Sequence, residues 1–367
     1  MINRSSLYTF FFFLAFFSIN IFFINPVYIL GFAGVILSLF FIKPIGISKI
    51  TMVNFIFFLV ISFGFVAGFY FQDFYYKEIT PVYLSSILFC YSILLGLFCY
   101  EIGLKVELDK RKMVYKLVNK LLLLFLIVEL ILRLLNPDYS EISFYKYKSS
   151  VLYYDSNFTG IVISVFLMFF VFLREKGIYN IGGISLILYL ILLILTFSRA
   201  SIVAFIISYI CVVAFGKYFR YLVVLILAGF TYLAFKLVNL YLSGESFVDF
   251  DGSFNSKFYI ISQAIELYGN LPFMLKFFGI GLANFAQYAG IFAHNIIVTF
   301  VFEFGIFGSF AFIFYFIYLY LKTKGNVLYI LLPVLIGGFS LFSAYSAFLF
   351  ILSIVVLIET KSTEKGV

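Results

Sequence analysis

The chain has 367 residues, of which 64% are hydrophobic and only 11% are charged, and its formal net charge is +8. A soluble globular domain is about half apolar and about a quarter charged, so this composition excludes an ordinary soluble protein. The basic residues are scattered over short segments and do not cluster on one face, which argues against nucleic acid as a partner. A membrane is therefore the expected environment.

Apolar stretches recur along the whole sequence, many of them with the roughly 18 residues that a helix needs to cross about 30 Å of hydrocarbon. Because backbone polar groups must be satisfied within the segment in lipid, such spans are helical. We predict an all-α integral membrane protein, a polytopic helical bundle of about twelve transmembrane helices that forms one domain, 1–367. The expected spans are 7–24, 27–42, 50–71, 79–100, 117–135, 158–173, 178–197, 200–215, 221–239, 294–320, 327–339 and 341–358, the last two of which alternatively form one broken hairpin.

The distribution of basic residues predicts the orientation of these spans. If the N-terminus is cytoplasmic and the spans alternate, sixteen of the 25 lysines and arginines fall in inner segments and six in outer segments. Cytoplasmic loops of membrane proteins carry such an excess of Lys and Arg. We therefore expect a multi-pass protein of the bacterial cytoplasmic membrane with both termini in the cytoplasm.

Two of the predicted outer, periplasmic loops are unusually long, 136–157 and 241–293. Within the second, apolar side chains recur at helical spacing at Phe258, Ile261, Ile265 and Tyr268. This pattern predicts an amphipathic helix that lies on the outer leaflet. Long loops in compact proteins usually carry function, so these two loops are where we expect the chemistry.

The only histidine, His294, stands where the large outer loop enters a predicted span. A lone histidine is more often structural than catalytic, but its surroundings form a pattern. Asn295 follows it, nine further residues separate Asn295 from Gly305, and two residues separate Gly305 from Gly308. On one straight helix, both glycines would lie on the same stripe as His294 and would let a neighbouring helix approach beneath it.

This run resembles the H-[NSQ]-x9-G-x-x-[GTY] signature of the O-antigen ligase and polymerase superfamily. Upstream, Gly279-Ile280-Gly281 with Asn284 and Phe285 is similar to the G-x-G-x-x-x-F segment that precedes the histidine in these enzymes.

Two further segments extend the resemblance over roughly residues 140–310. Thr196-Phe197-Ser198-Arg199-Ala200 resembles the family's T-x-[ST]-R-[AG] segment at an outer turn between two spans. Asp155-Ser156-Asn157 looks like its D-P-N element, with Ser in place of Pro. The order and the shared outer side of these short motifs favour the family more than any one of them does.

The sequence departs from the family at two basic positions. Lys148 and Lys257 stand where family members commonly have arginine, and only Arg199 is kept as arginine. Lysine keeps the positive charge but lacks the bidentate fork that grips a diphosphate. We therefore expect Arg199 as the main cationic site, and Lys148 and Lys257 either as its substitutes or as solvated loop charges.

The resemblance implies transfer of a glycan from undecaprenyl diphosphate to a sugar hydroxyl. His294 would be the base for that hydroxyl and Arg199 would stabilise the leaving diphosphate, and we count both as catalytic. Lys148, Lys257, Asn157 and Asn295 would bind the diphosphate or the sugar. Attack opposite the diphosphate would invert the anomeric centre.

The one D-x-D pattern in the sequence is Asp249-Phe250-Asp251, and we interpret its two carboxylates as loop charges. We therefore expect neither a metal nor another cofactor. Other charges inside the spans are expected to be structural. Glu129 and Arg133 are four residues apart and would form an internal pair. Glu303 would be paired with Lys236 or Arg133.

The predicted function is therefore a polymerase that joins lipid-linked repeat units into O-antigen or capsular polysaccharide. The expected ligands are undecaprenyl-diphosphate-linked glycans, as donor and acceptor, and membrane lipid. A chain-length regulator and a flippase are candidate partner proteins. The first alternative is a ligase, which transfers the same donor glycan to lipid A–core and shares all of these motifs. The alternative from another class is a flippase, but transporters concentrate polar features near the bilayer midplane.

Overall fold

The computed structural model describes residues 3–16, 26–40, 48–139, 146–150, 154–214, 229, 232–233, 235–244, 252–339 and 347–365. The chain is mostly helical, with one pair of very short strands. The first half contains α1 (Arg4–Phe16), α2 (Pro26–Leu39), α3 (Lys49–Tyr75), α4 (Leu84–Gly103), α5 (Leu108–Leu135), β1 (Ser149–Ser150), β2 (Tyr154–Asp155) and α6 (Ser156–Glu175). The second half contains α7 (Gly183–Leu195), α8 (Arg199–Tyr209), the π-helix η2 (Ile210–Ala214), α10 (Gly252–Asn270), α11 (Phe273–Phe278), α12 (Phe285–Ala289), α13 (Ile296–Val298), the π-helix η3 (Thr299–Phe304), α14 (Gly305–Lys322), α15 (Leu328–Gly338) and α16 (Ala347–Lys365).

Four helical segments within the described ranges are long and apolar enough to cross a membrane: α3, α4, α6 and the run Ile296–Lys322, which comprises α13, η3 and α14. This agrees with an all-α membrane protein but not with the predicted count of about twelve spans. Several other apolar helices, such as α7 and α15, are shorter than a full crossing. Most of the expected span 221–239 and the ends of several others lie outside the described residues.

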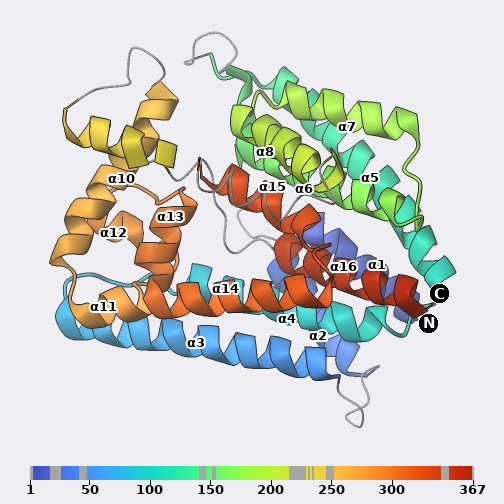
Figure 1. Cartoon of the computed structure of the whole chain (residues 1–367), viewed down its shortest axis with the longest axis horizontal. Coiled ribbons are helices and arrows are strands. Elements are labelled where there is room, and N and C mark those ends of the chain that lie inside the picture. Colours follow the sequence, from blue (N-terminus) through green and yellow to red (C-terminus); the bar gives the residue numbers. More distant parts are fainter. Residues whose placement is uncertain are drawn as a thin grey trace.

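Two groups of helices share one hydrophobic core (Figure 1). In the first, α7, α8 and α15 pack around α6, whose side chains are buried from Thr159 to Leu173, and α5 packs against α7. In the second, α3 lies beside α4 and α14. Helix α16 joins the two groups through its contacts with α1, α4 and α15. The short helices α10 to α13 form a cap over one end of α3 and α14, at the left of Figure 1.

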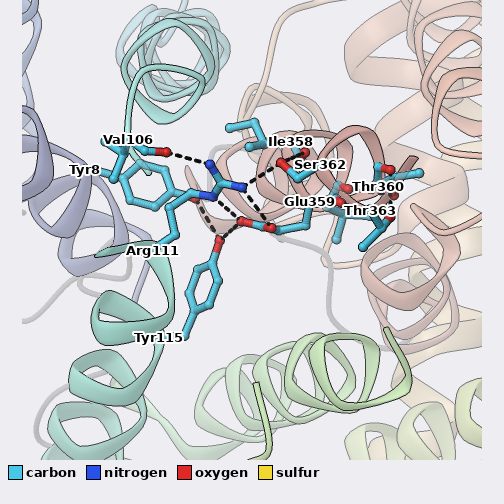
Figure 2. Close-up of polar contacts among 10 residues, drawn as sticks. Tyr8, Val106, Arg111, Tyr115, Ile358, Glu359, Thr360, Ser362 and Thr363 are labelled. Carbon is cyan, nitrogen blue, oxygen red and sulfur yellow. Dashed lines mark hydrogen bonds and ion pairs between the residues drawn. The ribbon is translucent and has the colours of Figure 1, made fainter. Parts of the chain in front are cut away.

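Three segments predicted to be cytoplasmic, the starts of α1 and α5 and the end of α16, meet at the right of Figure 1, away from this cap. There a buried ion pair joins α5 to α16, with Arg111 Nε 2.5 Å from Glu359 Oε1 (Figure 2). Tyr115 also donates to Glu359, and the hydroxyl of Tyr8 lies 3.1 Å from that of Tyr115. Ser362 accepts a further hydrogen bond from Arg111. This cluster fixes the start of α1, the start of α5 and the end of α16 together.

The helix expected in the large outer loop is present as α10. Helix α10 packs against α12 and α13, and its side chains Phe258, Ile260 and Ala264 are buried. Ile265, a member of the predicted apolar stripe, is 49% exposed. The position of this helix on the outer leaflet stays a prediction.

We predict that Glu359→Ala destabilises the fold by about 3–5 kcal/mol, because it leaves the Arg111 guanidinium buried without its counter-ion. Thermal unfolding of the detergent-solubilised protein would measure this effect. The control is Glu107→Gln, which removes the exposed pair with Lys110 on the same helix and should change stability by about 1 kcal/mol at most. Equal effects of the two variants would contradict the assignment.

Candidate functional site

Lys148 and Asp155 are held together by a small antiparallel hairpin. Ser149 pairs with Asp155 across the two strands, and the backbone N–H of Ser156 donates to the Lys148 carbonyl at 2.9 Å. Asp155 is also the N-cap of α6, because its carboxylate accepts from the backbone N–H of Asn157 at 2.8 Å. The Asn157 amide donates to the same carboxylate at 3.1 Å. Asn157, predicted to bind substrate, therefore holds Asp155 in this structure.

The turn that carries Arg199 is attached to the same end of α6. The Ser156 hydroxyl donates to the Thr196 carbonyl at 2.9 Å, and Phe197 adopts a positive φ of 56° at the turn. Ser198 caps α8, and its hydroxyl lies 2.9 Å from that of Ser201. The Ser201 side chain approaches α6 so closely that a Cβ at Gly160 would lie 2.7 Å from its hydroxyl oxygen. Arg199 itself is exposed at this end of the bundle.

His294 lies just before a helix and not within it. Its φ is 41°, and the following residue, Asn295, is the N-cap of α13. The Asn295 side-chain oxygen accepts from the backbone N–H of Ile297 at 2.8 Å, and its amide donates to the Phe339 carbonyl at 2.9 Å. Asn295 was predicted to orient the histidine or a sugar. In the structure its side chain caps α13 and binds the end of α15 at Phe339.

The glycines of the two motifs meet each other and do not lie beneath the histidine. Gly305 has a φ of +65° and interrupts the helix directly after the π-helix η3, so the predicted single stripe from His294 to Gly308 is wrong. A Cβ on Gly305 would lie 2.2 Å from the backbone nitrogen of Gly279. On the other side, a Cβ on Gly68 of α3 would lie 2.4 Å from the Gly279 carbonyl oxygen. Three stretches of backbone are therefore in direct contact.

The interrupted helix supplies hydrogen-bond acceptors to the loop that leads to His294. The carbonyls of Phe302 and Glu303 accept from the backbone N–H groups of Ile280 and Gly281, each at 3.0 Å. π-helical turns and helix breaks leave such carbonyls without their usual donors. The Glu303 carboxylate accepts from the backbone N–H of Phe285 at 3.3 Å. Its predicted pairing with Arg133 is wrong, because Arg133 lies beside Glu129 on α5.

The second part of this loop is fixed to the turn between α3 and α4. Asn284 is fully buried, and its side chain both accepts from the Val82 N–H at 2.6 Å and donates to the Val82 carbonyl at 3.0 Å. The backbone N–H of Leu282 donates to the Ser86 hydroxyl at 2.9 Å. The G-x-G-x-x-x-F segment is therefore a structural support, which presents α12 and the following loop with His294.

Electrostatic interactions connect four residues from three separate segments, Lys148, Asp155, Lys257 and His294. We call them the outer polar cluster, after the side of the membrane predicted for their loops. Burial lowers the pKa of His294 below its usual value, the positive charge of Lys257 lowers it further, and Asp155 opposes both effects. Burial likewise lowers the pKa of Lys257, Lys148 lowers it further, and Asp155 again opposes. The lowered pKa favours the neutral imidazole of His294, which interacts with Lys257 and Asp155.

Asp155 is the member of the cluster to which sequence reasoning gave no role. In the sequence it appeared only as part of a motif. An Asp at the start of a helix is nevertheless a usual signal for an N-cap. Its negative charge offsets the two lysines, so the cluster keeps a net positive charge. An uncharged base next to fixed cations is suited to deprotonate a hydroxyl and to bind an anion.

Among the residues that the structure describes, no group of three or more His, Cys, Asp or Glu side chains could hold a metal ion. Asp249 and Asp251 lie outside the described residues. The cysteines within the described ranges, Cys90, Cys99 and Cys211, are unpaired. Comparison with known proteins assigns no family, since neither a family model nor a curated protein matches the sequence.

Gly305→Ala should prevent the close backbone contact with Gly279 and strongly lower the thermal stability of the purified protein. The control is Gly177→Ala, because Gly177 has the same φ of +65° but nothing within 4 Å of a Cβ. Gly177→Ala carries the cost of a positive φ alone, about 1–2 kcal/mol. Gly305→Ala adds the cost of a backbone region that essentially only glycine adopts, since the ψ of Gly305 is −178°, and the steric clash. Equal unfolding temperatures would show that the contact is not needed.

The pKa of His294 can be read directly by NMR of histidine-labelled protein, because His294 is the only histidine. Lys257→Met removes a nearby cation and should raise this pKa, whereas Asp155→Asn removes an anion and should lower it further. Lys276→Met is the control and should leave it unchanged. A His294 pKa that does not respond to Lys257 or Asp155 would contradict the assembly of the cluster.

Proposed function

We propose that this protein is a membrane glycosyltransferase that uses a lipid-linked diphosphate sugar as donor. The observation that carries the proposal is the outer polar cluster, in which His294 and Lys257 of the large outer loop interact with Lys148 and Asp155 of the α5–α6 loop. These residues were singled out by separate motifs, and a base beside fixed cations matches the needs of glycan transfer from a diphosphate.

More particularly, we propose a polysaccharide polymerase of the O-antigen or capsular type. Its substrates would be undecaprenyl-diphosphate-linked repeat units on the outer face of the bacterial cytoplasmic membrane, and both termini would be cytoplasmic. The excess of basic residues in the opposite loops supports this orientation. Shorter apolar helices, such as α7 and α15, would supply crossings beyond the four long segments.

In the proposed reaction, His294 accepts the proton of the acceptor hydroxyl as its oxygen bonds to the anomeric carbon of the donor sugar. The bond between that carbon and the diphosphate oxygen breaks, and the diphosphate leaves with the electron pair. Lys148, Lys257 and Arg199 stabilise the negative charge that develops on it. Attack from the side opposite the diphosphate inverts the anomeric configuration, and no metal takes part.

Reconstitution with a defined lipid-linked repeat unit tests the proposal, because a polymerase, a ligase and a flippase give three different results. A polymerase extends the lipid-linked glycan without a further acceptor. Transfer that requires lipid A–core would identify a ligase, and translocation of intact donor across the vesicle membrane would identify a flippase. Either of the last two results, without polymer, would overturn the proposed activity.

Within that assay, His294→Ala should lower the rate of polymerisation by about 10²–10⁴-fold, as expected for loss of a general base. Arg199→Ala should also abolish most of the activity. Lys257→Arg should retain activity and Lys257→Ala should lose it, since arginine keeps the charge. Lys276→Ala, on α11, is the control, because it removes a lysine of the same loop that is outside the cluster, and it should leave the rate unchanged. Full polymer length from correctly inserted His294→Ala protein would show that the site is wrongly assigned.

A further inference from the structure

Helix α5 buries two opposite charges close to the outer polar cluster. Glu129 and Arg133 are each only 1% exposed, and Arg133 Nε lies 3.9 Å from Glu129 Oε1. That distance is too long for a hydrogen bond, and within the described ranges Nε and Nη1 of Arg133 have no hydrogen-bond partner. Buried charges are costly, and apolar side chains of similar size often stabilise a protein as well or better. Stability of α5 alone therefore does not explain the pair.

The side-chain hydrogen bonds that the pair forms with other described residues lead away from α5. Glu129 accepts from the Ser150 hydroxyl at 2.7 Å and, more weakly, from the Thr159 hydroxyl at 3.5 Å. Arg133 Nη2 donates to the Leu195 carbonyl at 2.7 Å. One helix is thus bonded to strand β1, to the first turn of α6 and to the end of α7.

Each of these three contacts lies next to a candidate site residue. Ser150 is two residues after Lys148 on the hairpin, and Thr159 is two residues after Asn157 at the start of α6. Leu195 is four residues before Arg199, directly ahead of the turn that the Ser156 hydroxyl also binds. The pair therefore contacts the supports of Lys148, Asp155 and Arg199 at the same time.

We propose that Glu129 and Arg133 are positioning residues for the outer polar cluster, which set the hairpin, the start of α6 and the α7–α8 turn in their catalytic arrangement. This inference rests on the proposed glycosyl transfer for its effect on rate. The pair touches no substrate. Its charge-assisted hydrogen bonds fix segments whose displacement by about 1 Å is enough to slow a reaction about 10²-fold.

The double variant Glu129→Leu/Arg133→Leu separates positioning from stability. We expect an unfolding temperature equal to or above that of the wild type, and a fall in kcat of about 10²-fold with a smaller change in KM. The NMR pKa of His294 should fall, because Asp155 no longer holds its place beside the histidine. The control is Glu107→Gln/Lys110→Gln at the exposed start of α5. It should change neither kcat nor the pKa of His294.

Two variants at Ser150 test the same link without disturbing the buried charges. Ser150→Thr keeps the hydroxyl that donates to Glu129 and should retain both the rate and the His294 pKa. Ser150→Ala removes it and should shift both in the direction of the double variant, with a several-fold loss of kcat. These variants keep the test valid if the double variant does not fold.

A wild-type rate and an unchanged His294 pKa in Ser150→Ala or in the folded double variant would overturn the proposed positioning role. If the wild-type protein makes no polymer, the proposed function fails. The pKa of His294 then tests by itself whether Glu129 and Arg133 position the outer polar cluster. A lowered His294 pKa in the double variant would then still support the link between α5 and the cluster. An unchanged pKa would reject it.

Discussion

The contact between the backbones of Gly68, Gly279 and Gly305 is the constraint on which the position of His294 depends. It lets the loop after α11 lie between α3 and the interrupted helix η3–α14, where no side chain would fit. The carbonyls released at that interruption bind the N–H groups of the loop. His294 is presented at this end of the bundle because the loop that leads to it is attached to the bundle by its own backbone.

A second set of contacts brings the remaining members of the cluster to the same end. Helix α6 is joined to the α7–α8 turn and to α8 by serine hydroxyls that donate to backbone carbonyls. The hairpin is joined to the start of α6 by the backbone N–H of Ser156, which donates to the Lys148 carbonyl. The charge of Asp155, placed by this arrangement, partly offsets Lys148 and Lys257 and leaves a net positive charge near His294.

Composition and periodicity were sufficient for the helical membrane fold and for the position of α3, α4 and α6, because long apolar runs allow few other structures. The internal pair Glu129–Arg133 was also predicted from its spacing. The sequence did not predict three features: the π-helix η3, the break at Gly305 and the position of His294 ahead of its helix. Each depends on a backbone contact with a segment distant in sequence, and a pattern within one segment carries no record of that partner. The same reason explains the unassigned role of Asp155.

The central claim is that the hairpin and α10 bring Lys148 and Lys257 together, and cross-linking tests it most directly. The protein would carry Lys148→Cys with Lys257→Cys in a background without Cys90, Cys99 and Cys211. The account predicts efficient joining by a short bis-maleimide, and little joining of Lys148→Cys with Lys276→Cys. Lys276 contacts Gly269, twelve residues or about 18 Å further along α10. Absence of the first cross-link, or equal yields of both, would contradict the site.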